Sequence, residues 1–297
     1  MDRVLSRKIR AIARDDQSGA AELALAAVDA VLVWRSTHKS FSPRSIIEVA
    51  RALSRAHSEM APLQRLAGEI AATSAASDPA AALRERLNRF RDTAATASAR
   101  IAARFSALLP PRKTRVATYS YSSTAVGAIL RAKRRISLVY VSEGRPGNEG
   151  RTTAAKLAHA GLRVVIVPDV VLLSQLPPVS HVIFGADAIL PNGFFNKTGS
   201  SLLLRTGLAH RARVWVLADT LKFLPHPPAF TPSLGECKPN WRFWNHPPAR
   251  VKLQDQIHEL VPYDSGMRFL TERGLMTVSA VRKHLHYLQR NTPRVAV

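Results

Sequence analysis

The chain has 297 residues, 46% of them hydrophobic, so it is long enough to bury a core as one large domain or two medium ones. Its 43 Lys and Arg against 21 Asp and Glu give a formal net charge of +22, which favours an acidic partner such as a nucleic acid, a phosphorylated metabolite or an acidic protein. The one cysteine, Cys237, excludes an intramolecular disulfide, and the lack of Cys and His at metal-ligand spacing predicts no metal and no cofactor.

The N-terminal stretch lacks the apolar core and cleavage site of a signal peptide, and no apolar run is long enough to span a membrane. We therefore expect a cytoplasmic protein with no membrane partner. Most of the arginines are dispersed along the chain, which is more typical of a solvated surface than of a nucleic-acid site. Nucleic-acid binding is therefore the less favoured interpretation of the charge.

Residues 1–110 are rich in Ala, Leu and Arg, and their apolar residues recur every three or four positions, which predicts a helical N-terminal domain. The expected helices cover 20–34, 45–56, 60–73 and 78–109. Asp78 followed by Pro79 is typical of a helix start, with aspartate at the N-cap and proline in the first helical position. The segment LPPRK (109–113) then ends the helices and predicts a domain boundary.

After residue 110, short β-rich runs alternate with helical stretches. The expected strands are RVATY (115–119), ISLVYV (136–141), RVVIV (163–167), HVIFG (181–185) and VWVLA (214–218). These runs are apolar without alternation, as strands covered on both faces require, and the intervals between them leave room for crossover helices. The sequence thus predicts a doubly wound, Rossmann-like α/β domain with a parallel sheet over residues 111–297.

Polar residues are concentrated just after the expected strands, where parallel sheets bind their ligands. The segments are SYSSTA (120–125), SEGRPGNEGR (142–151), ADAILPNGFFNKTGS (186–200) and DTLKF (219–223), all expected to be loops at one rim. Their hydroxyl, carboxylate and cationic groups suit a phosphorylated, hydroxylated small molecule. Neither GxxxxGK[ST] nor GxGxxG occurs, which argues against an ordinary nucleotide-binding fold.

Several of these residues have both a functional and a structural interpretation. Ser122, Ser123 and Thr124 lie at a strand-to-helix turn, where they either help to bind a phosphate or simply cap the helix. Asp187 follows a buried strand, so we expect a partly desolvated carboxylate whose raised pKa suits proton transfer. The alternative is an aspartate that hydrogen-bonds its own loop or pairs with an arginine.

The cations of the rim have two interpretations as well. Lys197 and Lys222 are either phosphate ligands or surface lysines whose stems cover apolar residues. Glu143, Arg145 and Arg151 are expected to form an ion-paired support for their loop rather than a catalytic group.

The blocks SYSST, SEGRPGNEGR, GADAILPNGFFNKTGS and ADTLKF, in this order and spacing, resemble those of a known family. That family joins the alpha, beta and delta subunits of translation initiation factor 2B with the methylthioribose-1-phosphate and ribose-1,5-bisphosphate isomerases. QSGAAEL (17–23) resembles its N-terminal Ser-Gly-Ala block, and LTERG (270–274) resembles its C-terminal Thr-Glu-x-Gly block. The resemblance covers nearly the whole chain and implies a sugar-phosphate pocket and a homodimer.

By this resemblance, Asp187 is the aspartate of the isomerases' acid/base pair, whereas Ser120 stands where the isomerases have a cysteine. A thiol can be tuned into a thiolate base, but a serine hydroxyl needs a neighbouring base, and TYSYSST contains none. The non-catalytic initiation-factor subunits carry a similar Ser-Tyr-Ser-Ser-Thr segment. The substitution therefore implies a retained pocket with half of the proton-transfer pair lost.

The resemblance also implies which residues hold the sugar phosphate: Ser18, Gly19, Ala20, Ser122, Ser123, Thr124, Asn196, Lys197 and Lys222. One cation of the family is missing, because His57 stands where an arginine is expected. Arg55 is the candidate to replace it.

The favoured function is that of a regulatory, non-catalytic protein like the initiation-factor subunits, binding a phosphorylated sugar of the ribose phosphate class. One alternative is an aldose–ketose isomerase acting on ribose 1,5-bisphosphate or methylthioribose 1-phosphate. A second is an RNA- or ribosome-associated protein, based on the charge and on KPNWRFWNHPPAR (238–250). In that segment Trp241 and Trp244 alternate with Arg242 and Arg250, as in base-stacking surfaces, although a dimer contact or a lid is the preferred interpretation.

Overall fold

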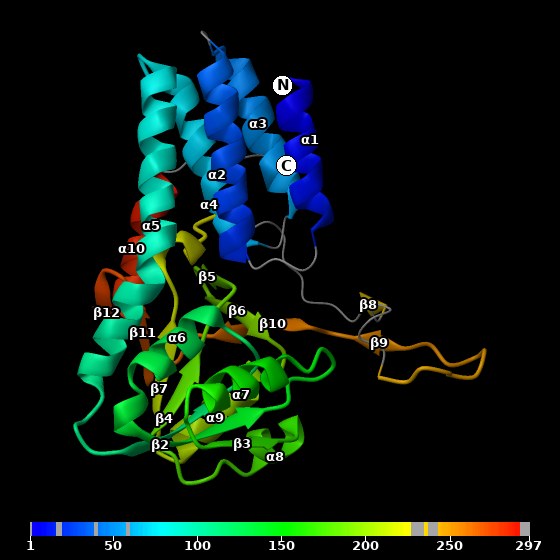
Figure 1. The fold of residues 1–297 in the computed structure, drawn as a ribbon, viewed down its shortest axis with the longest axis vertical. Coiled ribbons are helices and arrows are strands. Elements are labelled where there is room, and N and C mark those ends of the chain that lie inside the picture. Colours follow the sequence, from blue (N-terminus) through cyan, green and yellow to red (C-terminus); the bar gives the residue numbers. More distant parts are fainter. Residues whose placement is uncertain are drawn as a thin grey trace.

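The computed structural model describes residues 2–15, 20–38, 41–57, 60–226, 235–236 and 243–291. A helical region comes first, and a mostly parallel sheet flanked by helices follows it (Figure 1). No helix within these residues combines the length and the apolar character needed to cross a bilayer. The predicted fold class, a helical N-terminal region followed by an α/β region, is confirmed.

The helical region contains four of the predicted helices and one more. Its elements are α1 (Arg3–Arg14), α2 (Ala20–Thr37), α3 (Pro43–Ala56), α4 (Ala61–Ala71), the short 3₁₀ helix η1 (Ala72–Ala75) and α5 (Pro79–Leu108). The predicted start of α5 is confirmed, because the Asp78 side chain accepts a hydrogen bond from the Ala81 amide at 3.0 Å and Pro79 is the first helical residue. Helix α1 was not predicted, although Leu5, Ile9 and Ile12 form one buried face on it.

The central sheet has seven strands in the order β12-β11-β7-β4-β1-β2-β3. Their bounds are β1 (Thr114–Thr118), β2 (Ile136–Ser142), β3 (Val164–Val167), β4 (His181–Phe184), β7 (Arg213–Leu217), β11 (Met267–Thr271) and β12 (Gly274–Met276). The five predicted strands are all present and all parallel to their neighbours. The sheet is extended by β11, which is parallel to β7, and by β12, which is antiparallel to β11.

Helices cover both faces of this sheet (Figure 1). They are α6 (Ser123–Arg131), α7 (Glu149–His159), α8 (Asp169–Ser174), α9 (Ser200–Ala209) and α10 (Val278–Asn291), with the 3₁₀ turns η2 (Lys133–Arg135) and η3 (Thr220–Lys222). One buried cluster joins the sheet to α8, α9 and α10, and another joins it to α6, α7 and the second half of α5. Because both faces are covered, the strands contain few polar residues, which made them readable from the sequence.

A second, antiparallel sheet follows β4 and corrects the prediction that 186–200 is a loop. It consists of β5 (Ala188–Leu190), β6 (Gly193–Lys197) and β10 (His258–Pro262) in the order β10-β6-β5. A further two-stranded pair, β8 (Gly235–Glu236) with β9 (Gln254–Asp255), lies on an arm that extends from the body of the molecule (Figure 1). The second sheet matters for the site because it carries Asn196 and Lys197 on a strand.

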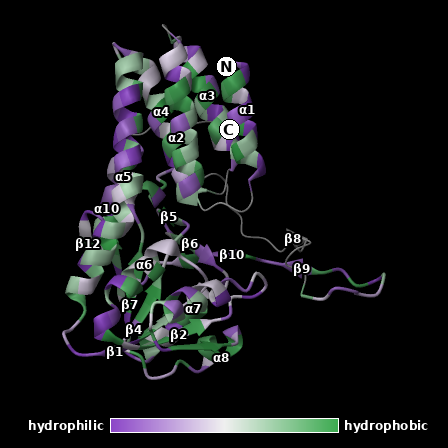
Figure 2. Ribbon diagram, viewed as in Figure 1, coloured by the Kyte–Doolittle hydropathy of each residue, from purple (hydrophilic) through white to green (hydrophobic). Residues whose placement is uncertain are grey.

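Helix α5 connects the cores of the two regions. Its first half contributes Leu83, Leu87 and Phe90 to the helical core, and its second half contributes Ile101 and Phe105 to the core on the sheet. Figure 1 shows the helix running from the top of the helical region down to the level of the sheet, and Figure 2 shows that it carries both hydrophilic and hydrophobic residues. The two regions therefore share one continuous element of 30 residues.

Candidate functional site

The segments that follow β1, β2, β4 and β7 meet at one rim of the sheet. These four strands are neighbours in the order β7-β4-β1-β2 and run parallel, so their carboxyl ends lie at the same edge. Parallel α/β sheets bind ligands at this edge. The topology thus gives the sequence-predicted residues a common location.

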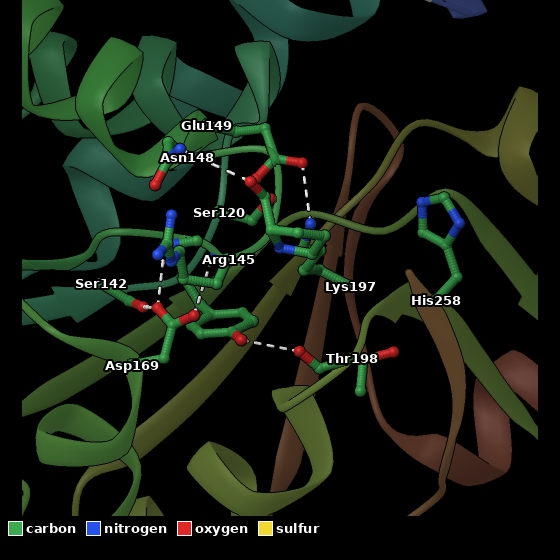
Figure 3. Close-up of polar contacts among 12 residues, drawn as sticks. Ser120, Ser142, Arg145, Asn148, Glu149, Asp169, Lys197, Thr198 and His258 are labelled. Carbon is green, nitrogen blue, oxygen red and sulfur yellow. Dashed lines mark hydrogen bonds and ion pairs between the residues drawn. The ribbon is translucent and has the colours of Figure 1, made fainter. Parts of the chain in front are cut away.

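Lys197 is the last residue of β6, and its side chain is only 4% exposed. Its ammonium Nζ lies 2.9 Å from Oε1 of Glu149, the first residue of α7 (Figure 3). A buried ammonium must be paired to avoid a large desolvation cost. The second sheet and α7 therefore hold a cation and a carboxylate together inside the rim.

Three unpaired polar atoms lie beside this ion pair. Within the described residues, four buried side-chain oxygens have no hydrogen-bond partner, and three of them are Asn148 Oδ1, Glu149 Oε2 and Thr198 Oγ1. Figure 3 shows these residues around Lys197. Buried polar atoms are rarely left without partners, so this concentration points to a place where water or a polar ligand binds.

Ser120 has a strained backbone. Its φ of 61° lies in the left-handed region, as does that of Asn148 at 58°, and only one other described non-glycine residue has a positive φ. The Ser120 carbonyl accepts a hydrogen bond of 2.8 Å from the hydroxyl of Thr153, which lies on α7 one turn after Glu149. Left-handed conformations of this kind are concentrated at binding and catalytic sites.

Ser122 caps a helix, which is the structural one of the two roles that the sequence allows. It is the N-cap of α6, where its hydroxyl accepts a hydrogen bond from the Ala125 amide at 3.3 Å. Gly185, at the end of β4, must lack a side chain because a Cβ there would lie 2.2 Å from the Ser122 hydroxyl oxygen. Of the two residues after Ser122, Ser123 is exposed and Thr124 is buried.

The loop between β2 and α7 is held by a carboxylate that the sequence reasoning missed. Asp169 accepts hydrogen bonds from the amides of Gly144 at 2.8 Å and Arg145 at 2.7 Å, and also from the Ser142 hydroxyl (Figure 3). Asp169 comes just after β3. Polar residues that follow a parallel strand are the ones that mark the rim, so this signal could have identified Asp169 as well.

Glu143 forms the ion pairs expected within the same loop. Its carboxylate lies 3.9 Å from Arg145 Nε and 4.0 Å from Arg151 Nη2. Both arginine side chains are more than half exposed, so these pairs contribute little to stability.

The expectation of a partly desolvated Asp187 is wrong, because its side chain is 51% exposed. Asp187 lies at a bend between β4 and β5, and it is exposed while Ala186 and Ala188 on either side of it are buried. Its carboxylate lies 3.6 Å from Nε2 of His258, a residue of β10 that the sequence reasoning missed. No local signal marked His258, since it is aligned with Lys197 only by pairing of β10 with β6.

Asn196 and Lys222 both hold backbone structure in this conformation. Asn196 Nδ2 donates to the Ser200 hydroxyl at 2.9 Å, which in turn donates to the Lys197 carbonyl at 2.6 Å. Lys222 lies on η3 and donates to the Ala186 carbonyl at 2.7 Å, directly before Asp187. The structure therefore places Lys222 next to the β4–β5 turn.

The N-terminus of α9, in the Asn-Lys-Thr-Gly-Ser segment, is already occupied by a carboxylate. Glu259 of β10 accepts hydrogen bonds from the amides of Gly199 at 2.9 Å and Ser201 at 2.8 Å. Gly199 has a φ of 104° and would place a Cβ 2.5 Å from the Tyr119 hydroxyl oxygen, so only glycine fits. The amides at this helix end are therefore already bonded to a carboxylate of the protein, as the Lys197 ammonium is to Glu149.

Tyr119 is a buried residue directly after β1. Its hydroxyl donates to the Thr198 carbonyl at 2.6 Å (Figure 3). Burial, and then the nearby carboxylates of Asp169, Glu259 and Glu149, raise the pKa of this phenol, so it stays protonated and acts as a donor.

Several predicted residues lie apart or outside the described residues. Ala20 is the first residue of α2, at the end of that helix that points toward the sheet (Figure 1), whereas Ser18 and Gly19 lie outside the described part. His57 Nε2 lies 2.8 Å from the Ile12 carbonyl oxygen of α1, and Arg55 lines a groove between α1 and α3.

The tryptophan loop is described only in part. Cys237, Trp241 and Arg242 lie outside the described residues, and Trp244 is 46% exposed. No group of three or more His, Cys, Asp or Glu side chains in the described part is arranged to hold a metal ion.

Comparisons with known proteins match this architecture. A profile of the Initiation factor 2 subunit family matches residues 16–277. The ribose 1,5-bisphosphate isomerase of Thermococcus kodakarensis is 27% identical over 174 residues, 54% of this chain and 52% of that protein. Translation initiation factor eIF2B subunit alpha of Dictyostelium discoideum is 30% identical over 112 residues, 36% of this chain and 35% of that protein. The chain thus spans about half the length of the first relative, 52%, and 35% of the second.

Two solved structures share the fold over most of the chain. Translation initiation factor eIF-2B from Pyrococcus horikoshii has a TM-score of 0.75 at 22% identity, covering 93% of this chain and 98% of that one. The 5-methylthioribose 1-phosphate isomerase of the same organism has a TM-score of 0.66 at 18% identity, covering 96% and 88%. At these identities they establish the fold alone. The family profile covers most of the sequence, and the chain therefore belongs to the Initiation factor 2 subunit family.

Proposed function

We propose that this protein binds a phosphorylated sugar of the ribose phosphate class at the rim of the sheet and acts as a regulatory, non-catalytic member of its family. The observation that carries the proposal is the buried ion pair of Lys197 and Glu149, with unpaired buried oxygens on Glu149 and on the sequence neighbours Asn148 and Thr198. A cation next to several hydrogen-bonding oxygens is suited to a ligand that has both a phosphate and hydroxyl groups.

The non-catalytic part of the proposal rests on Ser120 and Asp187. Serine replaces the cysteine that the isomerases have at this position, and a serine hydroxyl needs a neighbouring base to act in proton transfer. The Asp187 side chain is half exposed rather than enclosed within the site.

Aldose–ketose isomerisation is the second candidate, and one observation favours it. His258 lies 3.6 Å from the Asp187 carboxylate, and histidine is the residue most often used to move protons. Two relatives matched over 174 residues, at 27% and 26% identity, are named as ribose 1,5-bisphosphate isomerase. In this case His258 replaces the missing cysteine as the partner of Asp187, and Asp187→Asn and His258→Gln each abolish turnover.

Replacing the buried ion pair tests the binding site. Changing Lys197 alone would leave Glu149 without its partner and destabilise the protein, so we choose Lys197→Gln combined with Glu149→Gln, which removes both charges and retains a hydrogen bond. Calorimetric titration with ribose 1,5-bisphosphate should show at least about a tenfold loss of affinity, as expected for losing a charged hydrogen bond.

The matched control is Lys133→Gln, an exposed lysine on η2 that donates to the Ala160 carbonyl and lies at the amino end of β2, the opposite end of that strand from the rim. It should bind like the wild type. Unchanged affinity in the double variant, with folding verified by circular dichroism, would refute the assignment of the sugar phosphate to this pair.

We also propose that the protein is a cytoplasmic homodimer, as the family resemblance implies. The tetrameric eIF2B beta–delta complex of C. thermophilum, which has a TM-score of 0.70 with this chain, supports assembly as a feature of this fold. Light scattering of the purified protein measures the oligomeric state directly, and a monomer at micromolar concentration would contradict the proposal.

A further inference from the structure

A second polar cavity lies where the helical region meets the α/β region. It has a volume of about 420 Å³ and is lined by residues of α4, α5, η3, α10 and the turn between β11 and β12. Figure 1 shows α10 beside α5 at this level. The volume falls within the range of small-molecule sites.

The cavity wall is strongly cationic. Four arginines line it, Arg65, Arg86, Arg89 and Arg273, together with one carboxylate, Glu69. Outside the lining, Glu85 pairs with Arg89, and Glu272 lies 3.8 Å from Arg273. Guanidinium groups bind phosphate oxygens in a two-pronged geometry that suits this anion. A cavity with this wall attracts a ligand with two or more negative charges.

Glu69 positions two of the guanidinium groups. Its Oε1 lies 2.8 Å from Arg65 Nη2, and its Oε2 lies 2.5 Å from Arg86 Nη1. Arg65 is 13% exposed and Arg86 is 35% exposed, so both are partly withdrawn from water. The bridging carboxylate fixes the side chains while neutralising only one of their two charges.

The arginines also repel one another. Burial lowers the pKa of Arg65, Glu69 opposes this effect, and the nearby Arg273 and Arg86 lower the pKa further. Burial also lowers the pKa of His284 in the same wall, again with contributions from Arg273 and Arg65, so its imidazole favours the neutral form. A bound anion would relieve this repulsion.

Aromatic residues also line the cavity, and they suit an organic ligand rather than a bare inorganic ion. His284 and Tyr287 of α10 stack with their ring centroids 6.4 Å apart and an angle of 17° between the planes. Tyr287 is 61% exposed, so one part of its ring is free of the core. Phe90 of α5, beside Arg89 in the sequence, is the third aromatic or imidazole side chain in the lining.

This cavity is separate from the candidate site at the rim. None of the described residues assigned to the sugar phosphate lines it, and within the described part of the chain the two places share the short helix η3. Thr220 and Leu221 of η3 line the cavity, whereas Lys222 reaches the Ala186 carbonyl at the rim.

We propose that this cavity is a second ligand site, which binds a small organic molecule that has a phosphate ester and a planar or apolar group. Arg65, Arg86 and Arg273 hold the phosphate, and Tyr287 contacts the rest of the ligand.

Calorimetric titration of the full-length protein with pyrophosphate and with phenyl phosphate tests the site. Pyrophosphate tests binding by the arginines, and phenyl phosphate tests binding by the arginines and the aromatic residues together. The variants Arg86→Gln and Arg273→Gln should each lose about tenfold to 100-fold in affinity for both probes, since each removes a charged hydrogen bond. Both side chains are partly exposed, so these variants are expected to fold.

Two controls make the result specific. Arg100→Gln lies on the same helix as Arg86 but is exposed and does not line the cavity, so its affinity should be unchanged. The Lys197→Gln, Glu149→Gln double variant should retain the probes. The inference is overturned if neither probe binds the wild type, or if binding is insensitive to both cavity arginines. Loss of the probes in the double variant alone would place them at the rim and overturn it too.

Discussion

His181 is a buried histidine that the structure keeps neutral. It is 2% exposed at the start of β4, and its Nδ1 accepts a hydrogen bond from Trp215 Nε1 at 3.1 Å. Burial, and to a smaller extent Arg213, lowers the pKa of His181 to about 4. The neutral ring is therefore part of the native packing rather than of the site.

The lowered pKa of His181 makes stability depend on pH. The unfolded chain takes up a proton below pH about 6.5 while the folded protein does not until about pH 4, so the stability present above pH about 6.5 is lost as the pH falls. The expected loss is about 3 kcal/mol in the free energy of unfolding, measured by urea denaturation between pH 7 and pH 4.

The control is His181→Gln, which retains an acceptor for Trp215 but does not titrate. Burial raises the pKa of Asp219, which affects stability in the opposite direction, so the comparison rests on the difference between the two proteins. An identical pH dependence in wild type and variant would contradict the role of His181.

The segments that form the rim could be predicted from the sequence, because each directly follows a strand in the chain. Apolar strands and the residues that follow them are contiguous in the chain, so Ser120 and Lys197 were singled out within segments that the sheet brings together. Glu149 lies in one of these segments but was not singled out, because its pairing with Lys197 is long-range. The exposure of Asp187 could not be read in the same way. It depends on how the chain leaves β4 to enter the second sheet.

At the scale of elements, the second sheet was missed because its pairing is long-range. Strand β10 pairs with β6 about sixty positions earlier in the chain, and neither strand has the unbroken apolar pattern of the central sheet. His258 and Glu259 reach the site only through this pairing. Helix α1 was missed for another reason, since its few apolar residues lie among basic ones.

Helix α5 makes a prediction about how the two regions are joined. Phe105 lies on its second half, is fully buried, and meets Trp215 edge to face with the ring centroids 5.7 Å apart. Phe105→Ala should lower the free energy of unfolding by about 3–5 kcal/mol, the usual cost of removing a buried aromatic side chain. Chemical denaturation followed by circular dichroism measures this change.

Leu108→Ala is the control for that variant, because Leu108 is one turn away on the same helix and is 40% exposed. It should cost less than about 1 kcal/mol. A cost for Phe105→Ala no larger than for Leu108→Ala would mean that α5 does not anchor the sheet as described.

For the whole molecule, the net charge of +22 is large enough to attract nucleic acid without a specific site. Because we place the function at the rim, we expect binding to single-stranded RNA to be weak and to fall steeply with salt, as binding through phosphates alone does. Fluorescence anisotropy at several salt concentrations measures this dependence. Tight binding that persists at high salt would favour the RNA-associated alternative, with the exposed Trp244 as the first residue to change.

The most direct test of the central claim is an NMR experiment in which the purified protein is mixed with ribose 1,5-bisphosphate. We expect the ligand resonances to broaden on binding, because the rim retains its buried cation. We expect no ketose signals over time, because Ser120 stands where the isomerases have a cysteine. Conversion to the ketose would contradict the non-catalytic assignment and make Asp187 and His258 the acid/base pair. Sharp, unshifted resonances at every protein concentration would contradict sugar-phosphate binding itself.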